Sequence, residues 1–330
     1  MWNKIAELCN LHAPSGYEGA ASALASGYIK PFVDEIKTDA LGSVYGIKTV
    51  NPSFKTLLLD AHMDEIGVMI TGHEGGFLRF RTVGGIDPRM LMAREIRLLS
   101  GHYGVVACVP PHVQERGEAD KSVDAEDLFI DIGLDDASCV PVGTVGVFDV
   151  EFLDMGDCVT GKSLDNRLCL MAVLRALELA EAPKFNLIIA ATVQEEVGGR
   201  GAKAAAFGQA PDLCLVVDVT HGQTPDASKD MTFQTGGGPC VGIAPGIDKA
   251  MSGRLKKLAK EQNIPYQLEV MGGDTSTNGG DYQISREGIP TAELYIPIKY
   301  MHSPVELARK DDFENTAKLI AAFIDRGVTE

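Results

Sequence analysis

The sequence predicts an α/β protein, a three-layer α/β sandwich with an inserted small β-barrel domain. Three observations support this fold class. Short apolar runs of strand length recur along the chain, and segments with helical periodicity lie between and around them. One long internal stretch instead carries short β-rich pieces without a helical period. Alternating strands and helices are typical of a sheet covered by helices.

Four apolar runs have the length of a strand and contain almost no polar residues. They span residues 56–59, 187–193, 213–217 and 294–296. Strands that helices cover on both faces, as in a parallel sheet, have this composition. We therefore expect these runs to form the buried centre of the sheet.

Helical spacing of apolar residues predicts the covering layers. Between residues 166 and 181 the apolar positions recur close to every third or fourth residue. The other segments that read as helices are 5–9, 20–28, 249–262 and 312–326.

Residues 67–160 follow a different pattern. Turn residues such as Gly75-Gly76 and Gly84-Gly85 separate short β-rich pieces, which is typical of a small barrel or sandwich. The pieces are residues 77–80, 96–99, 104–107, 128–132 and 145–148. We therefore expect an α/β domain made of residues 1–66 and 161–330, interrupted by a β-rich domain of residues 67–160.

The bulk composition narrows the class of protein. The 330 residues are 45% hydrophobic and 23% charged, as in ordinary globular proteins. No apolar run approaches the roughly 20 residues that span a bilayer, and residues 1–7 do not resemble a secretion signal. We expect a cytoplasmic protein without a membrane partner. The net charge of −16 also disfavours nucleic acid as a partner.

The cysteines do not form a disulfide or thiolate-zinc pattern. Their number is odd, their spacing is scattered and no C-x-x-C motif occurs, so we expect reduced, buried thiols. The seven residues are Cys9, Cys108, Cys139, Cys158, Cys169, Cys214 and Cys240.

Side chains that can bind metal follow the apolar runs. In open α/β sheets, ligands bind beyond the carboxyl ends of the strands, so these side chains are expected to meet at one edge. A further aspartate, Asp165, begins the helix that follows the insert. The side chains that follow the runs are His62, Asp64, Glu195, Glu196, Asp218 and His302.

Spacing within this set indicates metal chemistry. One histidine or aspartate after a strand is usually a turn residue or a helix cap, but two adjacent glutamates repel each other unless a cation is present. His62 and Asp64 lie two apart on an extended segment and point the same way, so Asp64 can hold the ring of a metal-bound His62. Glu195 and Glu196 project differently, so one can bind metal while the other takes a proton from water.

Five sequence blocks, in this order, resemble those of the tetrahedral (TET) aminopeptidase family, which is metallopeptidase family forty-two and includes glutamyl and deblocking aminopeptidases. The blocks are Ala-His-Met-Asp-Glu-Ile-Gly (61–67), Ser-Leu-Asp-Asn-Arg (163–167), Val-Gln-Glu-Glu-Val-Gly (193–198), Val-Asp-Val-Thr (217–220) and Tyr-Met-His-Ser-Pro (300–304). The resemblance covers most of the chain, from about residue 5 to residue 306.

The resemblance implies a site for two divalent metal ions in each subunit. His62 and Asp218 would bind one ion, Glu196 and His302 the other, and Asp165 would bridge both. Oxygen and imidazole donors without thiolate suit zinc, cobalt or manganese. Zinc is the first expectation, with cobalt or manganese as alternatives.

The resemblance also implies an activity and an assembly. Glu195 would be the general base and Asp64 would support His62, in an aminopeptidase that releases N-terminal residues from short peptides by a metal-activated water. The fold would be that of the phosphorylase/hydrolase-like metallopeptidases. Residues 67–160 would form a dimerisation domain, and dimers would build a homo-oligomer, up to a hollow dodecamer.

The preferred N-terminal residue cannot be read from the sequence. Gly199 stands where family members usually carry a bulkier apolar residue, and residues 272–281 are more polar and richer in glycine than the corresponding family segment. Both elements shape the substrate pocket in the family. His221 lies close enough to Asp218 to line that pocket. The remaining histidines are expected to be surface or structural residues, namely His12, His73, His102 and His112.

Three alternatives stay open. A related dinuclear amidohydrolase or carboxypeptidase would use a similar metal site. A glucanase, a label given to some members of the family, would need two free carboxylates, whereas the obvious ones here are committed to metal and the chain has one tryptophan for sugar stacking. A non-catalytic binding protein with this fold would have lost a ligand, and none is missing.

Overall fold

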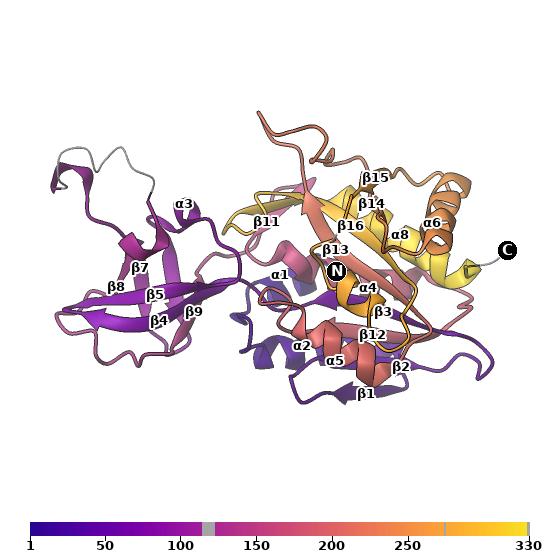
Figure 1. Ribbon diagram of the computed structural model, residues 1–330, viewed down its shortest axis with the longest axis horizontal. Coiled ribbons are helices and arrows are strands. Elements are labelled where there is room, and N and C mark those ends of the chain that lie inside the picture. The colour runs from indigo at the N-terminus through magenta and orange to yellow at the C-terminus, as the bar shows by residue number, and fades with distance from the viewer. Residues whose placement is uncertain (114–122, 274, 329–330) are drawn as a thin grey trace.

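The computed structural model describes residues 1–113, 123–273 and 275–328 and consists of two parts (Figure 1). The larger part is built on one sheet, which has eleven strands among the described residues. Its main path runs in the order β1 (Glu35–Thr38), β2 (Val44–Lys48), β12 (Asn186–Thr192), β3 (Thr56–His62), β13 (Leu213–His221), β16 (Thr291–Lys299), β17 (Glu306–Arg309), β11 (Cys158–Gly161) and β10 (Leu153–Asp154). β14 (Cys240–Ile243) also pairs with β16, and β15 (Gln267–Val270) pairs with β14.

The four predicted apolar runs form the parallel centre of this sheet. They are β3, β12, β13 and β16, and each neighbouring pair along this part of the path is parallel. β3 and β13 extend beyond their runs at the carboxyl end and β16 extends at both ends, whereas β12 has the length of its run. The prediction that Asp218 follows its strand was wrong, since β13 extends to His221 and holds Asp218 within it.

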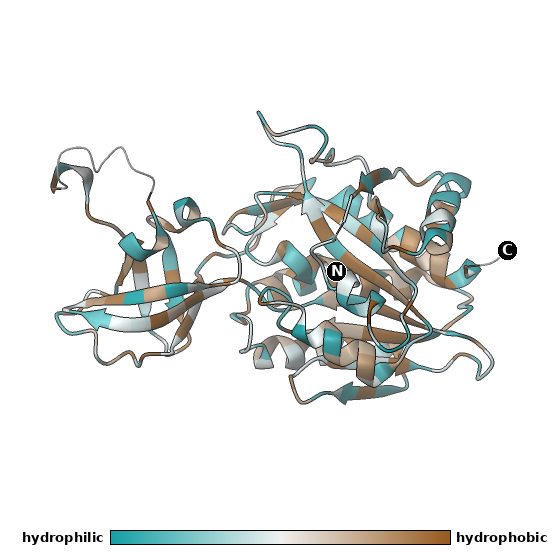
Figure 2. Cartoon of the chain, viewed as in Figure 1, coloured by the Kyte–Doolittle hydropathy of each residue, from teal (hydrophilic) through white to brown (hydrophobic). Residues whose placement is uncertain are grey.

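Helices cover both faces of the sheet, as predicted. Along β3, Leu57 and Leu59 join one apolar core and Leu58 joins the other, because successive side chains alternate between faces. Figure 2 shows these central strands as predominantly hydrophobic. The first core contains residues of α1 (Trp2–Cys9), α2 (Gly19–Ile29), α4 (Leu164–Leu179), α6 (Lys249–Glu261) and α8 (Lys310–Arg326), and the second contains residues of α5 (Arg200–Gln209) and α7 (Gly279–Gln283).

The predicted helices are confirmed, whereas α5 and α7 were not foreseen. α5 buries mainly small alanines such as Ala202 and Ala205, and α7 is a single short turn of helix, so neither shows a strong apolar period. The remaining helical turns are η1 (Lys30–Phe32), α3 (Pro88–Leu91), η2 (Pro111–Val113) and η3 (Ala125–Asp127). None of the described helices combines the length and the apolar composition that crossing a bilayer requires.

The smaller part is a closed barrel with its own apolar core, which confirms the predicted inserted barrel. The strands close in the order β4 (Gly67–Glu74), β5 (Phe77–Val83), β8 (Phe129–Asp131), β7 (Tyr103–Ala107), β6 (Glu95–Leu98) and β9 (Val145–Phe148). The barrel strands therefore end at residue 148. The later strands β10 and β11, although inside the expected 67–160 segment, pair with the large sheet through β17. Residues 114–122 of that segment lie outside the described residues.

All seven cysteines are free thiols, and four of them are buried, namely Cys9, Cys169, Cys214 and Cys240. Cys108 and Cys158 are half-buried. The expectation of burial was wrong for Cys139, which is exposed in a turn preceding β9 and lies 3.6 Å from the ring of His102.

Candidate metal centre

The predicted site residues meet at the carboxyl ends of the parallel strands. His62 is the last residue of β3 and pairs with Thr192, the last residue of β12. Asp60 of β3 pairs with Val216 of β13, so Asp218, two residues further along β13, lies level with His62. The parallel register thus places the loop after β12 and the end of β13 on either side of His62.

The structure brings the five predicted ligands into two groups that share Asp165. In each group the potential donor atoms lie within 4.8 Å of one another; the first contains His62, Asp165 and Asp218, and the second Asp165, Glu196 and His302. Asp165 Oδ1 lies 3.1 Å from His62 Nε2, and Asp165 Oδ2 lies 3.4 Å from His302 Nε2. The two oxygens of one carboxylate therefore face different groups, which is the arrangement a bridging ligand needs.

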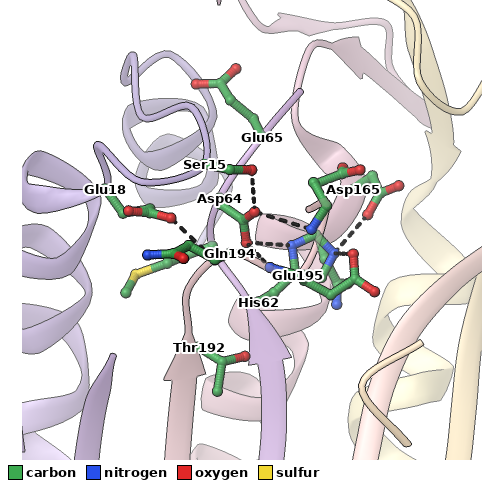
Figure 3. Close-up of polar contacts among 12 residues, drawn as sticks. Ser15, Glu18, His62, Asp64, Glu65, Asp165, Thr192, Gln194 and Glu195 are labelled. Carbon is green, nitrogen blue, oxygen red and sulfur yellow. Dashed lines mark hydrogen bonds and ion pairs between the residues drawn. The ribbon is translucent and has the colours of Figure 1, made fainter. Parts of the chain in front are cut away.

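Asp64 lies behind His62, on the side of the ring away from Asp165 (Figure 3). Its Oδ1 is 3.4 Å from His62 Nδ1 and accepts a hydrogen bond from the backbone N–H of Glu195 at 3.0 Å. Its Oδ2 accepts hydrogen bonds from Ser15 Oγ at 2.6 Å and from the backbone N–H of Glu196 at 3.2 Å. Burial opposes ionisation of Asp64, but the interaction with His62 outweighs it and lowers the pKa of the carboxyl.

Glu195 faces the same centre without belonging to either group. Its Oε2 lies 3.8 Å from His62 Nε2, and the side chain lines the cavity. Burial raises the pKa of Glu195 to about 7. The sequence left open which of the two adjacent glutamates binds metal; in the structure Glu196 joins the second group and Glu195 remains outside both.

The electrostatics of the cluster fit a divalent metal centre. Burial, reinforced by the charge of Asp165, raises the pKa of Glu196 and of Asp218 well above their ordinary values. Burial would lower the pKa of the two histidines, but hydrogen bonds to Asp165 raise the pKa of His62 well above its usual value and that of His302 to about 10. The cluster thus retains protons to offset its crowded carboxylates. Divalent cations would supply the same positive charge, and the imidazole and carboxylate donors are suitable ligands.

Four residues other than glycine in the ligand blocks have left-handed backbone conformations. These are Ser163 (φ 61°), Gln194 (φ 56°), Tyr300 (φ 60°) and His302 (φ 58°). Side chains other than glycine in this region cost about 1–2 kcal/mol each, and such strain concentrates at functional sites. The buried carboxylate of Glu306, which the sequence analysis did not identify, holds two of these blocks together. It accepts hydrogen bonds from the backbone N–H groups of Asp165 and His302, both at 3.1 Å.

A buried ionic cluster of Glu65, Lys162 and Arg167 connects the segment after β3 to the segment around Asp165. Glu65 lies 2.7 Å from Lys162 Nζ and 3.0 Å from Arg167 Nη2, and it accepts a hydrogen bond from the backbone N–H of Ala13. Burial would raise the pKa of Glu65, but the two cations lower it to about 2. The sequence blocks contained Glu65 and Arg167, and Lys162 stands directly before one of them, but only the fold shows that they pair.

A cavity of about 820 Å³ opens over the two metal-binding groups. Beyond the metal-binding groups, its wall includes Thr220, Glu269 and Tyr295, and His221 lines it as expected. Five residues of the polar 272–281 segment also border the cavity, and Asp274 lies outside the described residues. None of the other described histidines lines the cavity. His73 Nε2, for example, lies 2.7 Å from the carbonyl oxygen of Val140 in the barrel part.

An α/β sheet that carries such a cluster of carboxylates and imidazoles at its carboxyl edge, beneath an open cavity, defines the class of metal-dependent hydrolases. The comparison with known proteins identifies the family. The model of the M42 glutamyl aminopeptidase family matches residues 42–319, and the chain belongs to this family.

Relatives and solved structures agree with this assignment. The chain is 33% identical to a lysyl aminopeptidase of Pyrococcus furiosus over 98% of this chain and 96% of that protein. It superimposes on the TET aminopeptidase of a marine sediment archaeon of the Thaumarchaeota with a TM-score of 0.93, at 31% identity, covering 98% of this chain and 96% of the other. For the TET1 peptidase of Pyrococcus horikoshii the TM-score is 0.85, at 31% identity, with 99% of each chain covered.

The family establishes the type of reaction. The chain is a metal-dependent aminopeptidase, a hydrolase of peptide bonds that uses divalent metal. The predicted resemblance is confirmed, and the glucanase alternative is not supported.

Proposed function

We propose that the chain releases N-terminal residues from short peptides at a centre of two divalent metal ions. The observation that carries this proposal is the shared carboxylate of Asp165, whose two oxygens face His62 and His302 at 3.1 and 3.4 Å. His62 and Asp218 would hold one ion, Glu196 and His302 the other. Bound metal would polarise the scissile carbonyl and lower the pKa of water towards roughly 7. We propose zinc as the metal, with cobalt or manganese as substitutes that suit the same donors.

The protein's own groups supply the proton transfers. Glu195 takes a proton from the water that attacks the scissile carbonyl carbon, and it then gives that proton to the leaving amine nitrogen as the carbon–nitrogen bond breaks. Its side chain lines the cavity beside both ligand groups without belonging to either, which suits a group that accepts and returns a proton. Asp64 holds both the ring of His62 and the backbone of Glu195, so it positions a ligand and the base together.

A panel of aminoacyl p-nitroanilides tests this function. We expect hydrolysis of free aminoacyl substrates, loss of activity after dialysis against a chelator, and recovery on addition of Zn²⁺, Co²⁺ or Mn²⁺. Substrates with an acetylated amino group serve as the control, because a carboxypeptidase or amidohydrolase would tolerate the blocked N-terminus. Failure to cleave any free aminoacyl substrate in the presence of metal would contradict the proposal. One relative is a lysyl aminopeptidase and the family is that of the glutamyl aminopeptidases, so the relatives leave the preferred residue open.

We also propose that residues 1–66 and 161–330 form the catalytic domain, to whose sheet β10 and β11 are added, and that the barrel within residues 67–160 is a dimerisation domain. The barrel exposes large apolar side chains that contribute nothing to the metal centre, namely Phe77, Leu99, Tyr103, Val105 and Val142. The P. horikoshii relative assembles into a tetrahedron or an octahedral shell, and we propose a dimer-based homo-oligomer here. Light scattering should give a particle with an even number of subunits; a monomer at micromolar concentration would contradict this.

A further inference from the structure

One carboxylate in the cavity wall has no basic partner in the part of the chain that the structure describes. Glu269, on β15, accepts a hydrogen bond at its Oε1 from Thr220 Oγ1 at 2.8 Å. Its Oε2 is buried and has no hydrogen-bond partner among the described residues. A carboxylate removed from water without a counter-charge is costly, so this atom is placed to gain from a cation delivered by a ligand.

The position of Glu269 relative to the metal centre matches the length of a basic side chain. Asp218 and Thr220 lie two apart on β13, so their side chains point to the same face of the sheet. Two residues of a strand span roughly 7 Å. Because Thr220 holds Glu269, the free carboxylate lies about that far along the wall from the Asp218 ligand. The flexible four-carbon stem of lysine bridges a gap of this size.

Apart from the proposed base Glu195, one more carboxylate of the cavity wall lies outside the metal-binding groups, and it is already paired. Asp281 lies 3.5 Å from Lys203 Nζ. It reaches this place because Gly199 has no side chain; a Cβ there would stand 1.8 Å from Asp281 Oδ2. Lys203, which lines the cavity, is therefore paired with Asp281 and does not balance the charge of Glu269 when that carboxyl ionises.

We infer that Glu269 selects peptides whose N-terminal residue is lysine or arginine. The inference rests on the proposed function, since it assigns the pocket for the first residue of the peptide. The ammonium or guanidinium group pairs with the free Oε2 of Glu269. An apolar side chain leaves that oxygen without a partner, and an acidic side chain is repelled by it, so both are disfavoured.

Two substrates with the same four-carbon stem test this selection. Lysyl and norleucyl p-nitroanilide share a straight aliphatic stem, but only lysine carries the terminal charge. We expect wild-type kcat/KM to favour the lysyl substrate by about 10–100-fold, the range for a hydrogen bond to a charged group. Glu269→Gln should remove most of this preference by raising KM for the lysyl substrate, while the norleucyl values change less than about threefold. The exposed Glu287→Gln variant controls for the change in net charge and should keep the wild-type ratio.

Different experimental results would contradict this inference and the proposed function. If both substrates are cleaved equally well and Glu269→Gln leaves the ratio unchanged, the selection is wrong and the aminopeptidase assignment stands. If neither substrate is cleaved with metal present, the proposed function fails, and calorimetry with the free amino acids still decides the role of the pocket. Wild type should then bind L-lysine about tenfold more tightly than L-norleucine, with the difference lost in Glu269→Gln; equal affinities would overturn the inference.

Discussion

The carboxylate of Asp64 accepts a hydrogen bond from the backbone N–H of Glu195 at 3.0 Å. This contact joins the segment after β3 to the loop after β12. The same Asp64 oxygen faces Nδ1 of His62 at 3.4 Å. One buried carboxylate therefore fixes both the orientation of a proposed metal ligand and the backbone of the proposed base.

Replacing Asp64 by asparagine should weaken the metal centre. Asp64 faces four donor groups, from His62, Ser15, Glu195 and Glu196, and an amide would oppose some of them with its own N–H groups. We expect metal affinity to fall by about 10–100-fold, the usual effect of losing a carboxylate that supports a histidine ligand. Competition with a metal-responsive chelator measures this. Asp34→Asn, at an exposed position, is the control, and equal affinity in both variants would show that Asp64 has no such role.

Replacing Lys162 by methionine should destabilise the fold. The change leaves Glu65 buried with one cation in place of two and removes the hydrogen bond from Nζ to the carbonyl oxygen of Leu11. Breaking a buried ion pair costs about 3–5 kcal/mol, and denaturant unfolding followed by circular dichroism measures it. Lys37→Met removes the exposed pair with Glu35 and should cost no more than about 1 kcal/mol. Similar midpoints for the two variants would mean that the buried cluster is not an anchor.

Replacing Gly199 by alanine should disturb the rim of the cavity. Gly199 has φ 63°, and the new Cβ would collide with Asp281. The left-handed conformation alone should cost about 1–2 kcal/mol, and the displacement of Asp281 adds to it. Adding Asp281→Ala should recover the steric part of the lost free energy of unfolding. A double-mutant cycle with the two single variants, followed by denaturant unfolding, would measure this. Strictly additive losses would indicate that the two residues do not interfere.

The preference for basic residues should depend on pH. Burial raises the pKa of Glu269 to about 7; the hydrogen bond from Thr220 opposes this shift and the charge of Glu293 adds to it. Tyr295 and Cys240 also face Glu269, but burial raises the pKa of both, so they stay neutral near pH 7. Below about pH 7 the Glu269 carboxyl is protonated and cannot pair with a cation, and above it the carboxylate is charged. The preference should therefore grow as pH rises.

The ratio of kcat/KM for lysyl and norleucyl substrates between pH 5.5 and 8.5 measures this, since kcat/KM reports ionisations of the free enzyme. Titration of the metal centre affects both substrates and cancels in the ratio. Glu269→Gln should give a flat ratio. A wild-type ratio that falls with rising pH would contradict the assignment of Glu269.

Much of the candidate site could be predicted because its residues occupy ordered positions along the chain. His62 ends one buried parallel strand, and Glu195 and Glu196 follow the end of the neighbouring strand, so the sheet register brings these segments together at one edge. Asp165 lies in the first turn of α4, the helix after the insert, and this turn lies at the same carboxyl edge of the sheet. The barrel was visible because its pieces are short, β-rich and separated by glycines.

The features that the sequence did not predict depend on contacts between segments that are distant along the chain. Glu269 lies on the four-residue strand β15, and nothing near it in the sequence indicates that Thr220 holds it against the cavity. Glu306 and Lys162 act through backbone groups and carboxylates far along the chain. The end of β13 was placed too early because an apolar run stops at a polar residue, whereas the strand continues for as long as its backbone pairs with β16.

The central claim is that Glu196 binds metal and Glu195 moves the proton, and one paired measurement on Glu195→Gln and Glu196→Gln tests it. Metal content per subunit and turnover are measured on both proteins after identical loading. Glu195→Gln should keep two metal ions and lose about 10²–10⁴-fold in turnover, the contribution of a positioned base, whereas Glu196→Gln should lose one ion. Loss of metal from Glu195→Gln with full occupancy in Glu196→Gln would reverse the two roles, and unchanged turnover in both would contradict the mechanism.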